Sequence, residues 1–169
     1  MSIFSGPDMT VMQLTVLFAL LACAVATDVQ HRLIPNWLTY PSMVLGVFLG
    51  TISSGFPGGA ESAAGICLGA TLFALPVVIL GRGAGDLKLL AALGSIGGPI
   101  FVLWCALFAE IAGGLLSAAL LISRGRLGTT VAAVAVDIGG GHVPAARSQI
   151  SIPYAVPMCA GALAAMFLM

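Results

Sequence analysis

Long apolar runs separated by short polar segments are the main pattern along this chain. The runs cover about 9–27, 37–52, 62–80, 87–123 and 150–169. A helix needs about 20 apolar residues to cross the hydrocarbon core of a bilayer. The run 87–123 is too long for one ordinary span, and it is interrupted at Gly97-Gly98-Pro99. The pattern therefore predicts membrane-spanning helices, with two shorter ones in this longest run.

Composition supports a membrane protein. The chain is 60% hydrophobic and 7% charged, whereas a soluble domain is about 45–50% apolar and about 25% charged. So few charges cannot cover a water-facing surface of this size. The formal net charge is zero and gives no sign of nucleic-acid binding. We expect the lipid bilayer as a partner and no nucleic acid.

The positions of the cations predict the topology. Positive residues favour the cytoplasmic side of short loops. Six spans, with a break at 97–99, place every Lys and Arg in the cytoplasm, whereas five spans would put the last three outside. The cations are Arg32, Arg82, Lys88, Arg124, Arg126 and Arg147.

The resulting expectation is an all-α, polytopic membrane protein with six transmembrane helices and both termini outside. Residues 1–169 form a single membrane-embedded domain, with 53–61 as an outer turn and 124–149 as a cytoplasmic loop between spans five and six. The segment 1–10 has no Lys or Arg, whereas a cleaved signal peptide has a positive first region. We therefore expect the first apolar run to be a retained span.

The sequence carries no pattern for a metal or nucleotide cofactor. Each cysteine lies inside an apolar run, without the close C-x-x-C pairs of metal sites, and is interpreted as a small buried hydrophobe. The glycine run 139–141 is followed by His142 and lacks the Lys-Ser/Thr that completes a phosphate loop. We expect no cofactor and no metal site. The cysteines are Cys23, Cys67, Cys105 and Cys159.

Two polar islands, 28–36 and 81–88, carry the candidate chemistry. Asp28 ends a helix that runs inward, and Asp86 starts a helix that runs outward. Two spans separate them, so both carboxyl groups face the same side at similar depth. Two carboxylates that share a proton can activate water for peptide hydrolysis, because like charges close together cannot both ionise.

Each aspartate also has a structural interpretation. Asp is a favoured N-cap and complements the dipole at a helix start, which would account for Asp86. Asp28 lies near a helix end, where the dipole disfavours an anion. An ion pair with Arg32 at i,i+4 would contribute only about 0.2–0.5 kcal/mol. This weak compensation favours a functional interpretation of Asp28.

The two islands resemble the two signatures of the type IV prepilin leader peptidases, membrane aspartyl proteases of the GxGD type. The segment 152–155 (Ile-Pro-Tyr-Ala) also resembles the family's closing motif. The matching positions are Asp28, Arg32, Ile34, Pro35 and Asn36 in the first signature, and Gly83, Gly85, Asp86 and Lys88 in the second.

The resemblance implies a multi-pass protein of the bacterial cytoplasmic (inner) membrane that cleaves a short basic leader from prepilin-like substrates on the cytoplasmic side. It makes Asp28 and Asp86 the catalytic pair. It implies substrate-binding or supporting roles for Arg32, Pro35, Asn36, Gly83, Gly85 and Lys88.

The chain differs from the larger, bifunctional relatives. Those carry a cytoplasmic insert with two paired cysteine motifs and also methylate the new N-terminus. Here only 28–36 separates the first two spans, and no C-x-x-C occurs. The chain resembles the short, peptidase-only form of tight-adherence (Flp-type) pilus systems, and we expect no methyl transfer.

Other interpretations remain open at the level of the sequence. Glu110 lies within the fifth span, and an intramembrane acid is a functional candidate by default. It could accept a proton, face the substrate, or be a protonated side chain hydrogen-bonded between helices. The whole chain could instead be a small proton-coupled transporter, or a non-enzymatic subunit of pilus assembly. The sequence does not specify the oligomeric state.

Overall fold

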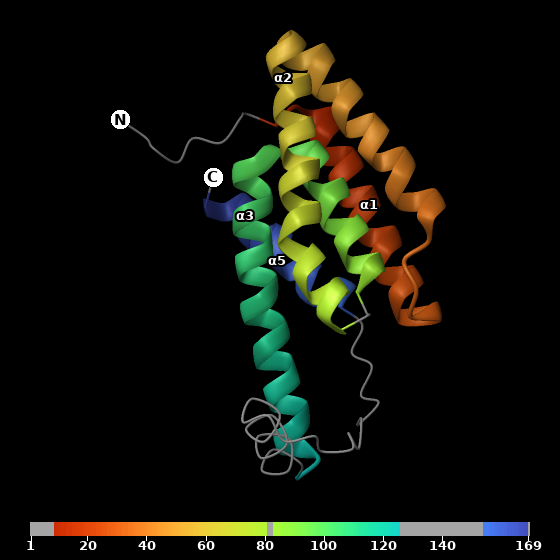
Figure 1. Ribbon diagram of the computed structural model, residues 1–169, viewed down its shortest axis with the longest axis vertical. Helices are drawn as coiled ribbons and strands as arrows, with labels where there is room; N and C mark the ends of the chain where they lie inside the picture. Colours follow the sequence, from red (N-terminus) through yellow and green to blue (C-terminus); the bar gives the residue numbers. More distant parts are fainter. Residues whose placement is uncertain (1–8, 81–82, 126–153, 169) are drawn as a thin grey trace.

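The computed structural model of the protein describes residues 9–80, 83–125 and 154–168. All regular structure in this part of the chain is helical, which confirms the all-α prediction. The described helices are α1 (Val11–His31), α2 (Asn36–Leu80), α3 (Ala84–Ser123) and α5 (Ala155–Leu168) (Figure 1).

Helices α2 and α3 each turn back on themselves at one glycine. Gly55 has φ 67° and ψ −152°, and Gly98 has φ 78° and ψ −179°. Positive φ is accessible to glycine at little cost, and Pro99 disfavours a helical conformation in the residue before it. The break in α3 lies where the sequence predicted it. The predicted outer turn 53–61 is wrong in extent, because this segment is helical on both sides of Gly55.

Three helices are long and apolar enough to cross a membrane. They are Val11–His31, Asn36–Ala74 within α2, and Ala84–Ser123, and the apolar helix of α5 is shorter. Figure 1 shows that the two halves of α2, and the two halves of α3, run in opposite directions. Six spans remain a prediction. The predicted loop 124–149 lies outside the described residues except for Arg124 and Gly125.

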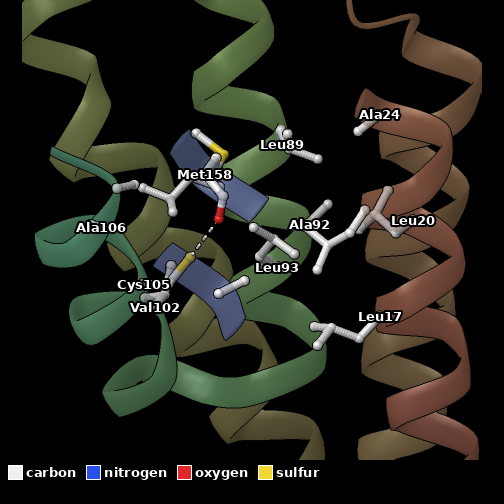
Figure 2. Close-up of a cluster of buried hydrophobic side chains, with 14 of the residues drawn as sticks. Leu17, Leu20, Ala24, Leu89, Ala92, Leu93, Val102, Cys105, Ala106 and Met158 are labelled. Carbon is white, nitrogen blue, oxygen red and sulfur yellow. Dashed lines mark hydrogen bonds between the residues drawn. The ribbon is translucent and has the colours of Figure 1, made fainter. Parts of the chain in front are cut away.

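The first half of α3 is the centre of the bundle. Every residue from Leu89 to Gly98 is buried, as expected for a helix that is apolar on all sides. Side chains of α1, of the second half of α3 and of α5 surround it (Figure 2). Asp86 lies one turn before this buried stretch, so the central packing fixes its position.

Small residues allow the helices to approach closely. The backbones of Gly65 in α2 and Gly94 in α3 touch, and a Cβ on either glycine would overlap the other's carbonyl group. Ser95 Oγ donates a 3.4 Å hydrogen bond to the Ser42 carbonyl, which joins α3 to the first half of α2. Close approach at small residues is the usual way in which membrane helices pack, because lipid provides no hydrophobic force between them.

The cysteines only partly follow the prediction of burial. Cys105 is fully buried, and its thiol lies 3.8 Å from the Met158 carbonyl oxygen (Figure 2). Cys159 is partly buried, whereas Cys23 and Cys67 are exposed. The prediction is wrong for the last two because they lie on the outer faces of α1 and α2. An apolar run does not show which face of a membrane helix points outward.

Candidate active site

Asp28 lies in the last turn of α1. The helix continues to His31 and ends at Arg32, which has a left-handed backbone conformation (φ 52°, ψ 32°). The Arg32 N–H donates to the Asp28 carbonyl at 2.8 Å. The Asp28 side chain is only 7% exposed. A carboxyl group at this depth needs a hydrogen-bond donor.

The donor comes from the other end of the chain. The backbone N–H of Ala155, the first residue of α5, donates to Asp28 Oδ2 at 2.8 Å in a buried position. The first N–H groups of a helix lack partners within it and carry its positive dipole end, so they stabilise an anion. The Arg32 side chain is exposed, and no ion pair joins these two described residues. The proposed i,i+4 pair is therefore not what holds Asp28.

Asp86 lies in the first turn of α3 and is half-buried. The N-cap is Gly83, in a left-handed conformation (φ 92°, ψ 13°), and no side chain caps this helix start. Asp86 is therefore not the N-cap, but its place in the first turn still lets its charge complement the helix dipole. The Gly83 carbonyl accepts from the Leu87 N–H at 3.0 Å. Gly83 thus starts the helix in a conformation suited to glycine.

The first polar island and residues 83–88 of the second meet at one end of the bundle, where α1 ends and α3 and α5 begin (Figure 1). Gly85 packs against Ile34, because a Cβ on Gly85 would lie 3.4 Å from the Ile34 Cβ. Lys88 Nζ donates to Asn36 Oδ1 at 2.9 Å and lies 5.5 Å from the centre of the Tyr40 ring. These contacts join the start of α3 to the start of α2.

Asp86 lies within electrostatic range of two other carboxyl groups. The charges of Asp28 and Glu110 both act on it. The described residues contain no group of three His, Cys, Asp or Glu side chains that could hold a metal ion. The charges of these three acids therefore influence one another. Among the described residues, they do not form a cluster that could bind a metal ion.

The remaining predicted residues lie at the edge of this region. The Pro35 carbonyl accepts from the N–H groups of Leu38 and Thr39, at 3.1 and 3.4 Å, and so helps to start α2. Arg32 is exposed near the end of α1. The cation Arg82, and the Ile-Pro pair at 152–153, lie outside the described residues.

The sequence did not identify two of these connections. The donor to Asp28 is the main chain of Ala155, and a backbone N–H leaves no signal in the residue type. Tyr154 donates from its hydroxyl to Glu110 Oε1 at 2.6 Å. The sequence indicated each residue separately: Tyr154 lies in the closing motif, and Glu110 is an intramembrane acid. Their pairing depends on the packing of α5 against α3.

An apolar groove of about 700 Å³ lies between the second halves of α2 and α3. Glu110 supplies its one carboxyl group, and the other side chains are hydrophobic. The lining residues are Leu72, Phe73, Leu103, Trp104, Ala106, Leu107 and Glu110. Glu110 accepts from Tyr154, and the neighbouring Ala155 donates to Asp28, so the groove adjoins the candidate site.

This arrangement can support general acid–base chemistry. Two carboxyl groups from different helices interact at one end of a membrane bundle, and one of them is buried. Such a pair can take a proton from water and supply a proton to a carbonyl oxygen or a leaving amine.

A sequence model of the type IV leader peptidase family matches residues 15–122. The matched segment contains Asp28, Asp86 and Glu110, and it ends before α5. No curated protein and no solved structure matches the chain significantly.

Proposed function

The chain belongs to the type IV leader peptidase family, and from this premise we propose that it is an aspartic endopeptidase that removes the basic leader from type IV pilin-like precursors. The family implies prepilin leader cleavage by an aspartic protease. The observation that carries the proposal for this chain is the placement of Asp28 in the last turn of α1 and of Asp86 in the first turn of α3, within electrostatic range of each other.

In the proposed reaction, the two aspartates share the acid and base roles. The ionised carboxylate removes a proton from water, and the oxygen attacks the carbonyl carbon of the scissile peptide bond. The protonated carboxyl group polarises the carbonyl oxygen. The tetrahedral intermediate collapses as the leaving nitrogen receives a proton, which gives a free carboxylate on the leader and a free amine on the pilin.

We assign the base role to Asp28. The Ala155 N–H and the positive end of the α5 dipole stabilise a negative charge on Asp28, and they oppose the unfavourable dipole of α1. Asp86 also lies near a positive helix end, in the first turn of α3, but it is within electrostatic range of two other carboxyl groups, and like charges close together cannot all ionise. Asp86 therefore suits the role of the proton-carrying partner.

Neighbouring residues have supporting roles in this proposal. Gly83 and Gly85 allow the tight start of α3 and its contact with the first island. Lys88 and Asn36 hold the starts of α3 and α2 together. Pro35 helps to begin α2, and Arg32 ends α1 beside the site.

The proposal also includes topology and location. The chain crosses the bacterial inner membrane six times as one domain, with α1, the halves of α2 and α3, and the segment containing α5 as spans. Both termini then lie outside, and Asp28 and Asp86 face the cytoplasm. The loop 124–149 lies on the same side as the two aspartates.

The test is cleavage of a pilin precursor co-expressed in the same membrane. The intact protein should reduce the mass of the precursor by that of the leader. Asp28→Asn and Asp86→Asn should each abolish this change at matched membrane levels. The double variant should be no worse than either single variant, because members of one catalytic unit are not additive.

Glu61→Gln is the matched control, because Glu61 is an exposed carboxylate of α2 far along the chain from both aspartates. It should cleave at the wild-type rate. Substantial cleavage by either Asn variant would defeat the proposal, and the transporter and assembly interpretations would return.

A further inference from the structure

Tyr154 is held against two helices immediately before α5. Its hydroxyl donates to Glu110 Oε1 at 2.6 Å. Its ring meets the Phe73 ring edge-to-face, with centroids 5.9 Å apart and planes at 64°. A Cβ on Gly113 would lie 3.3 Å from Tyr154 Cε2, so the ring also lies on the face of α3 that carries Glu110.

The main chain of the same residue accepts the first hydrogen bond of α5. The Tyr154 carbonyl accepts from the Met158 N–H at 3.2 Å, which is the first hydrogen bond of this helix. The next N–H along the chain, that of Ala155, is the donor to Asp28. One peptide unit therefore separates the anchored side chain from the group that holds the buried aspartate.

We propose that Tyr154 and Glu110 are positioning residues, whose hydrogen bond fixes the start of α5 and thereby the Ala155 N–H that orients Asp28. The expected effect of this hydrogen bond on the rate of cleavage rests on the proposed function. It also explains why an acid occurs in an otherwise apolar groove. The Glu110 side chain is the acceptor that the Tyr154 hydroxyl needs beside the hydrophobic residues of α3.

The geometry distinguishes this role from a direct one. If Glu110 acts through the hydrogen bond, an uncharged acceptor should serve as well. Glu110→Gln keeps a carbonyl oxygen for the Tyr154 hydroxyl, whereas Glu110→Leu removes it. Tyr154→Phe removes the donor and keeps the ring contact with Phe73, so it serves as a second variant if the Leu variant fails to fold.

The test combines cleavage kinetics with amide hydrogen exchange of the peptide that covers residues 154–158, on the full chain in detergent. Tyr154→Phe and Glu110→Leu should speed exchange there. They should lower kcat about tenfold or more, because small displacements of a catalytic group have effects of this size. KM should change by less than about threefold, since substrate binding is not the step affected.

Three variants serve as references. Glu110→Gln should restore exchange and kcat to within about threefold of the wild type, as expected if only an acceptor is needed. Thr71→Val deletes a hydroxyl on α2, and Glu61→Gln removes a distant carboxylate. Both should match the wild type in exchange and in kcat.

Either of two results would overturn the inference. One is unchanged exchange and kcat in Tyr154→Phe. The other is a Glu110→Gln variant as impaired as Glu110→Leu, which would mean that the charge acts directly. If the wild type cleaves no pilin precursor, the proposed function fails by itself, and the exchange comparison alone decides whether this hydrogen bond fixes α5.

Discussion

At the scale of single residues, Asp28 and Asp86 differ in how the fold holds them. Asp28 is buried and accepts the N–H of Ala155, so its side chain has both a structural and a proposed chemical role. Asp86 is half-buried in the first turn of α3, within electrostatic range of two other acids. Substitutions at Asp28 can therefore separate folding from catalysis.

We expect Asp28→Asn to remain folded and Asp28→Leu to be destabilised. The Asn side-chain oxygen can accept the Ala155 N–H, whereas Leu leaves this buried donor without a partner, at a cost of about 1–3 kcal/mol. Unfolding of the purified proteins by denaturant, monitored by circular dichroism, measures the difference. Both variants should lack cleavage. Equal stabilities of the two would show that the Ala155 hydrogen bond contributes little.

The contact between Lys88 and Asn36 should give a measurable but small coupling. It is a 2.9 Å hydrogen bond between exposed groups that lie far apart in the sequence. We expect about 1 kcal/mol or less, because water competes with exposed charged partners. A double-mutant cycle of Asn36→Ala and Lys88→Met, measured by the free energy of unfolding, isolates it. Strictly additive effects would mean that the pair does not stabilise the junction of the islands.

At the scale of helices, close contacts position the catalytic end. The first half of α3 is buried from Leu89 to Gly98, and Gly94 touches Gly65 of α2. Asp86 is carried at the start of this half-helix. Any change that pushes α3 away from α2 should therefore also displace Asp86.

Gly94→Val should disrupt the bundle, because the added side chain has no space beside the Gly65 backbone. Overpacking of this kind costs about 1–3 kcal/mol, and occasionally more. Gly114→Val is the matched control, since nothing lies within 4 Å of a Cβ on Gly114. Thermal unfolding and size-exclusion elution in detergent should show a loss for Gly94→Val only. A normal midpoint for Gly94→Val would mean that the two helices can separate at little cost.

At the scale of the whole molecule, the turns within α2 and within α3 lie toward the end of the bundle opposite the one where α1 ends and α3 begins (Figure 1). If each half of α2 and α3 crosses the bilayer, Ser54 is outside and Ser123 is in the cytoplasm. Both side chains are exposed. The two positions therefore report the two sides of the membrane.

Single cysteines at Ser54 and Ser123 should be labelled from opposite sides of sealed cells by a membrane-impermeant maleimide. The unchanged chain gives the background from the four native cysteines. The reason is the number of membrane crossings. The two halves of α3 cross twice, so Ser123 lies on the same side as Asp86, whereas Ser54 lies one crossing away from that side. Labelling of both positions from the same side would remove the six-span topology.

The sequence by itself determined the membrane class, the helical fold and the break in α3. Scarcity of charge excludes a water-facing surface, and Gly98 followed by Pro99 cannot continue a regular helix. Two predicted spans separate Asp28 from Asp86, and this even number also predicted that both lie at the same end. These features depend on local chemistry along the chain, so no tertiary contact was needed to predict them.

Only the tertiary structure decided what touches the aspartates. The Ala155 N–H is a main-chain group that becomes a partner of Asp28 when α5 packs beside α1. The pairing of Tyr154 with Glu110 likewise depends on the packing of α5 against α3. Burial of Cys105 and exposure of Cys23 follow from which helix faces point inward. In a membrane protein both faces of a helix can be apolar, so hydrophobic periodicity does not identify the inner face.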